Sequence, residues 1–420
     1  MQLRDSRTAI RAVPNLILLP FVAPIDASDM KVQDSEPSIL GLGLVQRTVL
    51  AAGRAGYGQI FFLTRDHVAP QRTTAIPNWR NLTDVLVPSQ MASLIVAPAA
   101  ILSETDWLER LAATRIEPAS WAAIGDRIVV LPARAVVESL AVLDAEGGAY
   151  SMAAVQERLT RRFGSAGTVP AEIDPLVIAT LKDVRVAERR LLRALVKKTD
   201  GFMARHVDRP ISLQISRLLA PTAVTPNQIT MISGVIGLCG APFFLSASWS
   251  WQTVGALLFL FHSIVDGCDG ELARLRFQES RYGGILDFWG DNIVHAVIFT
   301  CMAVGWTLAS DAMWPLLLGA TATAGTLGSA GFIYWRQMRT KDGGDPLFTS
   351  VSTTPNDRLA RLLDIASRRD FIYLVLILAL LGKSNWILLL ASLGTPMFFF
   401  FLVLLAVRER LKSRSTRSFA

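Results

Sequence analysis

Hydrophobic and polar positions divide the chain into two parts with different patterns. In the first part, short apolar runs alternate with stretches in which apolar residues recur at helical spacing, as in residues 39–57. Strands that alternate with helices predict an α/β domain with a largely parallel, Rossmann-like sheet covered on both faces. Ligands of such sheets bind at the carboxyl ends of the strands. The predicted strands are residues 15–22, 59–64, 84–89, 93–98 and 128–132, and a helix follows the last of them.

The second part, from about Thr225 to Val407, consists mostly of long apolar runs. A membrane span needs about 20 apolar residues, and the pattern predicts an all-α domain with six spans. The fifth segment is too short unless its helix begins earlier, within residues 358–370. The predicted segments are residues 226–246, 251–272, 284–308, 313–335, 370–383 and 386–407.

A basic stretch joins the two parts. Residues 181–220 carry ten Lys/Arg against four Asp/Glu, and their apolar residues recur at helical spacing. This pattern predicts amphipathic helices on a membrane surface, and a solvated linker helix is the alternative. The predicted organisation is an α/β domain (1–180), juxtamembrane helices (181–220), a membrane domain (221–410) and a basic tail (411–420).

Composition and charge support a membrane location. The chain is 51% hydrophobic with a mean hydropathy of +0.38, which is too apolar for an ordinary soluble enzyme. The net charge is +7, but the positive residues gather at the ends of apolar segments, which indicates anionic lipids rather than nucleic acid as a partner. The loops at residues 246–252 and 309–312 contain no Lys or Arg. The positive-inside rule therefore predicts a multi-pass membrane protein with both termini and the first domain in the cytoplasm.

Four aspartates lie at the ends of two predicted membrane helices. Asp266 and Asp269 are three residues apart, and Asp287 and Asp291 are four apart, so each pair shares a helix face. The short loop between the helices predicts that the four carboxylates converge. Clustered charges at a membrane need cations or protons to persist. Hard oxygen ligands suit Mg²⁺ or Mn²⁺, and we expect two ions bridging a substrate pyrophosphate, with one carboxylate as general base.

Small and basic residues accompany these aspartates. Gly270 and Gly283 would let a nucleotide or phosphate approach the backbone, and Arg274, one turn after Gly270, could hold a phosphate oxygen. For the glycines, close helix packing is an equally simple explanation. His262 and His295 each lie one turn from an aspartate, and we expect both to be packing residues.

The spacing of these residues resembles the signature of the CDP-alcohol phosphotransferase family. The pattern runs Asp266-x2-Asp269-Gly270-x2-Ala273-Arg274-x8-Gly283-x3-Asp287-x3-Asp291, and all eight fixed positions match. The upstream sequence TPNQIT, residues 225–230, is similar to the Pro-Asn element of the family and includes Asn227. The resemblance covers about residues 195–407.

The resemblance implies a six-helix, usually dimeric membrane domain that transfers a phosphoalcohol from a CDP-alcohol to an acceptor hydroxyl and releases CMP. By position, Asp266, Asp269 and Asp287 would bind metal, and Asp291 would be the general base and could also contact the second metal. The implied CDP-binding residues are Asp266, Asp269, Asn227, Gly270, Ala273, Arg274 and Gly283. For an acceptor phosphate the candidates are Arg205, Arg209 and Arg281, and lipid headgroups are the alternative partners of these arginines.

The layout of the chain also resembles that of bifunctional inositol-1-phosphate cytidylyltransferase/di-myo-inositol phosphate phosphate synthases. Residues 45–64 look like a helix and strand of a sugar nucleotidyltransferase, and residues 197–212 resemble the junction of those proteins. However, residues 19–31, where a glycine-rich triphosphate loop is expected, contain no glycine. The first domain is therefore either an active cytidylyltransferase or, as we prefer, a degenerate domain that binds a ligand, supports the membrane domain or mediates assembly.

Several functions remain open from the sequence. The reaction could join inositol phosphate to CDP-inositol, or it could use CDP-diacylglycerol in phospholipid synthesis. A cation transporter would use the acidic cluster as an ion path, but it would need acidic residues near the membrane midplane on several helices. A catalytically inactive membrane scaffold is the third alternative, and the four intact aspartates argue against it.

Overall fold

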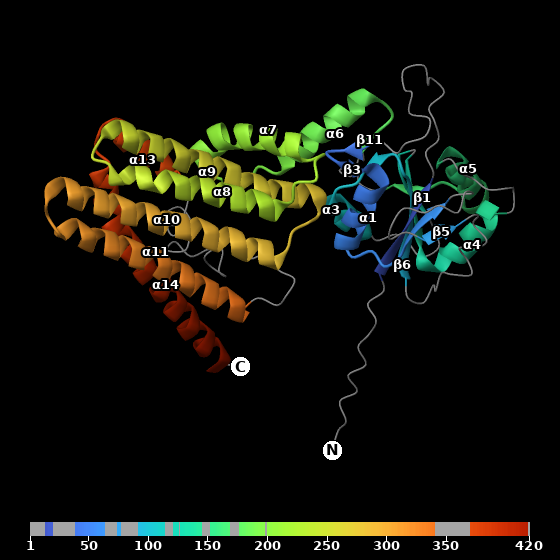
Figure 1. Ribbon diagram of the computed structural model, residues 1–420. Coiled ribbons are helices and arrows are strands. Elements are labelled where there is room, and N and C mark those ends of the chain that lie inside the picture. The colour runs from blue at the N-terminus through green and yellow to red at the C-terminus, as the bar shows by residue number, and fades with distance from the viewer. Residues whose placement is uncertain are drawn as a thin grey trace. The chain divides into compact units, whose positions relative to one another are not determined.

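A computed structural model describes most of the chain, and Figure 1 shows its elements. The chain divides into two compact units, Met1–Leu191 and Leu192–Ala420, and each is treated separately below. The described residues are 13–19, 38–63, 74–76, 91–113, 121–125, 127–144, 152–168, 176–197, 200–340 and 370–418. The predicted strand at 84–89 and most of the loop at 19–31 lie outside them.

The first unit is built on a seven-stranded sheet with the order β10-β8-β9-β6-β1-β4-β5. The inner strand β1 pairs in parallel with β4 and with β6, and its side chains are buried, as the continuous apolar run predicts. The sheet strands are β1 (Val13–Leu19), β4 (Ile60–Leu63), β5 (Thr74–Ile76), β6 (Met91–Pro98), β8 (Ala122–Ile124), β9 (Ile128–Pro132) and β10 (Gly167–Thr168).

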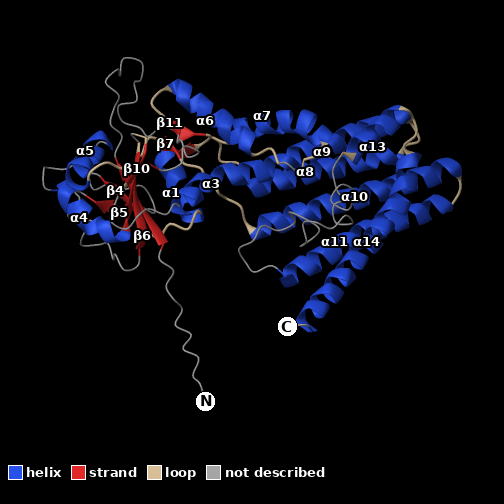
Figure 2. Cartoon of the chain, turned by 180° about the vertical axis from the view of Figure 1, so that it is seen from behind, coloured by secondary structure: helices blue, strands red, loops and turns tan. Residues whose placement is uncertain are grey.

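Helices cover the sheet on both faces, as Figure 2 shows, which confirms the predicted α/β layering. Side chains of α4 and α5 form the core on one face together with β1, β4, β6 and β9. The helices are α1 (Leu44–Arg54), α3 (Thr105–Ala113), α4 (Ala133–Asp144), α5 (Met152–Phe163) and α6 (Leu181–Ala194). Two short ribbons, β2 (Ser38–Ile39) with β3 (Leu42–Gly43) and β7 (Ile101–Leu102) with β11 (Leu176–Val177), complete the unit.

The sheet is mixed: its strands run largely parallel, as predicted, except that β9 runs antiparallel to both of its neighbours. The cause is the tight turn between β8 and β9. Gly125 adopts a positive φ of 56°, and the amide of Arg127 donates to the carbonyl of Ile124 at 3.3 Å. A turn this short can join only antiparallel strands. The apolar run that predicted β9 carries no information about its direction.

The second unit is helical. A π-helical turn (Ala204–Asp208) and α7 (Arg209–Leu219) lie within residues 181–220, where juxtamembrane amphipathic helices are predicted. Each of the six predicted membrane segments coincides with a helix. These are α8 (Pro226–Gly240, extended by a 3₁₀ turn, Ala241–Leu245), α9 (Trp249–Arg276), α10 (Arg281–Ser310), α11 (Trp314–Thr340), α13 (Phe371–Leu380) and α14 (Asn385–Ser418).

Four helical segments among the described residues, rather than six, are long and apolar enough to cross a membrane. They are Pro226–Leu245, Arg281–Ser310, Trp314–Met338 and Asn385–Arg408, and they indicate a multi-pass membrane protein. The other two predicted segments differ for separate reasons. The helix α9 has charged residues in its second half, and α13 has ten residues, about half of a span. The earlier start expected for the fifth helix lies outside the described residues.

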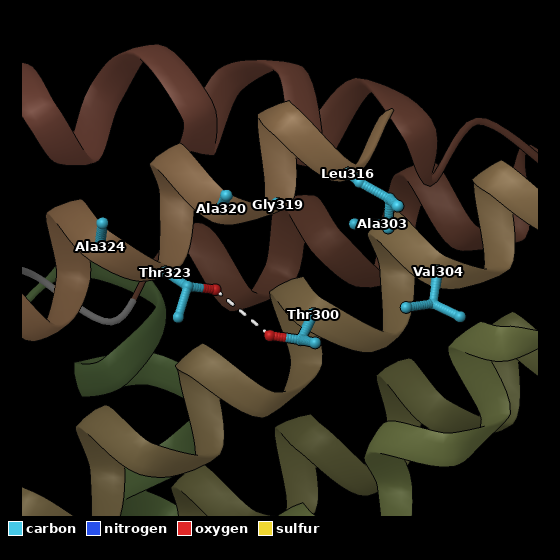
Figure 3. Close-up of a pocket in the computed structure, with 8 residues that line it drawn as sticks. All are labelled: Thr300, Ala303, Val304, Leu316, Gly319, Ala320, Thr323 and Ala324. Atoms are coloured by element: carbon cyan, nitrogen blue, oxygen red, sulfur yellow. Dashed lines mark hydrogen bonds between the residues drawn. The ribbon is translucent and has the colours of Figure 1, made fainter. Parts of the chain in front are cut away.

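Small residues let the helices of the second unit pack at backbone distance. A Cβ atom on Gly255 would lie 2.9 Å from the carbonyl oxygen of Gly240, so α8 and α9 touch through their main chains. A Cβ on Gly305 would overlap the carbonyl oxygen of Phe244. Figure 3 shows the surface of the α10–α11 pair, where small side chains line a shallow apolar groove and Thr300 and Thr323 share a hydrogen bond of 3.3 Å.

We expect Gly305→Ala to destabilise the second unit, because its new methyl group would overlap the Phe244 carbonyl. Overpacking of this kind costs about 1–3 kcal/mol of unfolding free energy, which thermal unfolding in detergent would detect as a lower midpoint. Gly331→Ala is the matched control, since nothing lies within 4 Å of its Cβ position. Equal midpoints for the two variants would contradict the packing described here.

Candidate active site and metal centre

The turn between α9 and α10 brings the aspartates together. Helix α9 ends at Arg276, because Phe277, its C-cap, adopts a left-handed φ of 58°. Ser280 then caps α10 by accepting the amide of Gly283 at 3.0 Å. Because only a few residues separate the two helices, α10 begins beside the end of α9, and it then packs on α8 and on the 3₁₀ turn that follows α8. The sequence-predicted faces of the two helices therefore meet at one end of the unit.

Three of the four aspartates form a cluster. One carboxylate oxygen each of Asp266, Asp269 and Asp287 lies within 4.8 Å of the others. Asp266 and Asp269 are 2% and 7% exposed, and Asp287 is half-buried. Like charges this close and this buried repel strongly, and hard oxygen donors at such separations suit a divalent cation. The donor set therefore fits Mg²⁺ or Mn²⁺.

Two hydroxyl groups on α8 hold the buried carboxylates. Ser233 Oγ donates to Asp266 Oδ1 at 3.2 Å, and the Thr230 hydroxyl donates to Asp269 Oδ2. The amide of Gly270 donates to the other oxygen of Asp269. The sequence analysis did not identify Thr230 or Ser233. Their spacing could have revealed them, because both follow Asn227 at intervals of three and share its helix face.

His262 faces the fourth aspartate. Its Nε2 lies 3.5 Å from Asp291 Oδ1, and its Nδ1 lies 2.8 Å from the carbonyl oxygen of Ser233. A carbonyl only accepts, so Nδ1 is the donor and Nε2 is directed at the carboxylate. The expectation of a simple packing residue was therefore wrong for His262. His295, by contrast, packs edge-on against Phe259 and Phe371, with ring centroids 5.3 and 5.4 Å apart.

The predicted nucleotide-binding residues surround the same end of α8, α9 and α10. A Cβ on Gly283 would lie 2.9 Å from Asn227 Oδ1, so the first turn of α10 approaches Asn227 closely. The guanidinium of Arg274 folds over Gly270, 3.3 Å from its Cβ position, and Ala273 is buried. A capping box between Thr225 and Gln228 fixes the start of α8 and thus the position of Asn227.

The three candidate acceptor arginines differ in their surroundings. Arg205 and Arg281 are exposed, and they donate to the Lys197 carbonyl and the Met338 sulfur, respectively. Arg209 is mostly buried and forms ion pairs with Asp200 at 2.9 Å and Glu271 at 2.5 Å.

Charge pairing sets the ionisation of this buried group. Burial opposes the charge of Arg209, but Asp200 and Glu271 outweigh it and hold the pKa of the guanidinium above its usual value. Burial likewise opposes the charge of Asp200, but the hydrogen bond from Arg209 holds the pKa of this carboxyl below its usual value. Both groups are therefore charged at neutral pH.

Comparison with known proteins gives a family for this region. Residues 223–398 match the family described as CDP-alcohol phosphatidyltransferase. A "Bifunctional IPC transferase and DIPP synthase" of Archaeoglobus fulgidus is 39% identical over 128 residues, which is 30% of this chain and 25% of that protein. An "Archaetidylinositol phosphate synthase" of Pyrococcus horikoshii is 30% identical over 114 residues, 27% of this chain and 58% of that protein.

A solved structure is also similar to part of the chain. It is the phosphatidylinositol phosphate synthase of Mycobacterium tuberculosis with CDP-DAG bound, which is 20% identical with a TM-score of 0.33. The match covers 46% of this chain and 94% of that one.

We expect Gly283→Ala to weaken the binding of CDP, because its methyl group would press on Asn227 Oδ1 and Ser280 Oγ. An overpacking cost of about 1–3 kcal/mol, if it falls on the bound state, corresponds to a Kd higher by about 5- to 150-fold, measurable with labelled CDP and Mn²⁺. Gly284→Ala is the control, since its Cβ position is open. If both variants bind CDP as the unmodified protein does, Gly283 does not shape the nucleotide site.

Proposed function

We propose that the region of residues 223–398, which matches the CDP-alcohol phosphatidyltransferase family, transfers a substituted phosphate from a CDP-alcohol to an acceptor hydroxyl, with release of CMP. The observation that carries this proposal is the carboxylate cluster of Asp266, Asp269 and Asp287, with Asp291 beside it on the same face of α10 as Asp287. The similarity to the two relatives described above covers only 25% and 58% of their lengths. The activity and the substrates of this protein are therefore proposals.

The cluster would hold a divalent cation. Asp266, Asp269 and Asp287 would be the ligands, Asp291 could contact a second ion, and Thr230 and Ser233 would fix the orientation of two of the carboxylates. When bound, such cations offset the charge on the pyrophosphate and on the departing CMP. Two ions, either Mg²⁺ or Mn²⁺, would match the four carboxylates in charge.

Asp291 would be the general base. Its carboxylate takes the proton from the acceptor hydroxyl, whose oxygen attacks the β-phosphorus of the CDP-alcohol. A bond forms between that oxygen and the β-phosphorus, and the bond from the β-phosphorus to the bridging oxygen breaks. CMP leaves with the bonding electron pair, and Asp291 later releases the proton to water. His262 Nε2, directed at Asp291, keeps this carboxylate in place.

The neighbouring residues would hold the donor. The candidates are the residues on the turns that carry the cluster and on the adjoining helix starts, and they would bind the CDP part: Asn227, Gly270, Ala273, Arg274 and Gly283. The exposed arginines Arg205 and Arg281 would meet a phosphate on the acceptor. The similarity to an archaetidylinositol phosphate synthase favours inositol phosphate chemistry. We therefore propose an inositol phosphate acceptor, with CDP-inositol or CDP-diacylglycerol as the donor.

The remaining proposals concern architecture. The helices α9 and α13 would complete a six-helix membrane domain that forms homodimers. The loop charges favour a cytoplasmic location for the first unit and the C-terminus. The first unit would then be a degenerate nucleotidyltransferase-like domain that supports the membrane domain, and cytidylyltransferase activity is the alternative.

We expect Asp291→Asn to lower the rate of CMP release by about 10²–10⁴-fold, since it removes a general base while keeping the size of the side chain. The measurement uses purified protein in detergent with Mn²⁺, with CDP-inositol plus inositol phosphate in one assay and CDP-diacylglycerol plus polar alcohols in another. Labelled CDP should still bind to the variant. An unchanged rate would exclude Asp291 as the base.

Metal removal should abolish the activity. Excess EDTA should stop CMP release, and Mn²⁺ or Mg²⁺ should restore it, because the clustered carboxylates bind the pyrophosphate only through a cation. Asp287→Asn should raise the Mn²⁺ concentration needed for half-maximal rate by about tenfold or more. Activity that persists in EDTA would contradict the metal-dependent mechanism.

A further inference from the structure

Glu271 is a fully buried carboxylate at 0% exposure, and the mechanism above does not use it. Three donors on α7 surround it. Arg209 Nη1 lies 2.5 Å from Oε1, Ser212 Oγ lies 2.7 Å from Oε1, and Ser216 Oγ lies 2.6 Å from Oε2. Residues 209, 212 and 216 follow each other at helical spacing, so all three donors lie on the face of α7 that contacts this carboxylate. Helix α7 packs along α9, as Figure 1 shows.

The other side of Arg209 is also engaged. Its Nε and Nη2 donate to the two oxygens of Asp200 at 2.9 and 3.2 Å. Such a bidentate pair fixes the plane of the guanidinium group. A second attachment holds the same juxtamembrane segment elsewhere, because the Tyr373 hydroxyl on α13 donates to Asp208.

Glu271 lies within one and a half turns of both metal-binding candidates on α9. It follows Asp269 by two residues and Asp266 by five. At about 100° per residue, its side chain leaves the helix on the face opposite to theirs. Ser233 and Thr230 hold Asp266 and Asp269 from α8, while α7 holds Glu271 from behind. This turn is therefore fixed from both sides by buried polar contacts.

We propose that Glu271 and Arg209 are positioning residues, which set the rotation and depth of this turn so that Asp266 and Asp269 stand at metal-binding separation. Burying an ion pair costs desolvation free energy that can exceed the attraction between the charges, so such a pair adds little to the free energy of unfolding. It does fix geometry, since a carboxylate with three donors has one favourable placement. The inference rests on the proposed metal-dependent function, and it gives Arg209 a role other than acceptor binding.

Direct Mn²⁺ binding tests this inference. The full chain in detergent is titrated with Mn²⁺ alone, and electron paramagnetic resonance measures the free ion. We expect Glu271→Gln to raise the Kd for Mn²⁺ by about tenfold, as loss of a supporting contact does at other metal sites. The half-saturating Mn²⁺ concentration for CMP release should rise in parallel, with a smaller change in kcat at saturating Mn²⁺.

Two control variants separate positioning from other effects. Glu271→Asp keeps the charge but is too short to reach its partners on α7, so positioning predicts weaker Mn²⁺ binding here too. Mn²⁺ binding equal to that of the unmodified protein would mean that Glu271 acts only through its charge, and would overturn the proposal. Tyr373→Phe releases the juxtamembrane segment from α13 and should leave the Kd unchanged. Equal weakening by Tyr373→Phe and Glu271→Gln would also overturn it, since general loosening would then explain both.

If Glu271→Gln does not fold, a less disruptive variant can test the same inference. Ser216→Ala removes one hydrogen bond and keeps the ion pair, and we expect Mn²⁺ binding weakened by about three- to tenfold. An unchanged Kd in this variant would overturn the inference. Unmodified protein that binds Mn²⁺ but releases no CMP from any donor would refute the proposed reaction alone. Unmodified protein that binds no Mn²⁺ would refute both.

Discussion

The structure of the second unit depends on one electrostatic constraint, the burial of several carboxylates at one end of an apolar helix bundle. Asp266, Asp269 and Glu271 lie within six residues of one helix and are all buried. Without compensation, such charges would take up protons or separate the helices. Hydroxyl groups from α8 and a guanidinium from α7 supply the compensation. The helices around α9 therefore supply hydrogen-bond donors to its buried carboxylates as well as apolar contacts.

Close helix contact makes this compensation possible. Short side chains such as those of serine and threonine reach a carboxylate on a neighbouring helix only if the two backbones nearly touch. Gly240 and Gly255 bring α8 and α9 to that distance, and Gly237 leaves room for His262, whose Cγ would lie 3.0 Å from an added Cβ. The glycines of the membrane helices therefore serve packing, while Gly283, beside Asn227, combines packing with access to the proposed nucleotide site.

Local spacing explains what could be predicted from the sequence. The aspartates of each pair share a helix face because they are three or four residues apart. Since the loop between the two helices is short, the convergence of the pairs could be predicted from the sequence. The pairing of Arg209 with Glu271 joins residues 62 apart, and no local pattern reveals it. The direction of β9 depended on the turn at Gly125. The apolar run at the start of α9 predicted a span, but the charges in its second half keep the helix out of the four segments that are apolar enough to cross a membrane.

The length of α9 has a consequence for how substrates meet. Its 28 residues extend about 42 Å at 1.5 Å per residue, about 12 Å more than the hydrocarbon thickness of a bilayer. Taken as the proposed second span, α9 therefore carries its charged end beyond the hydrocarbon, at the level of the headgroups. A donor with acyl chains would arrive there by lateral diffusion, while a polar acceptor would arrive from bulk water. Turnover would then follow the surface density of the donor in the membrane rather than its bulk concentration.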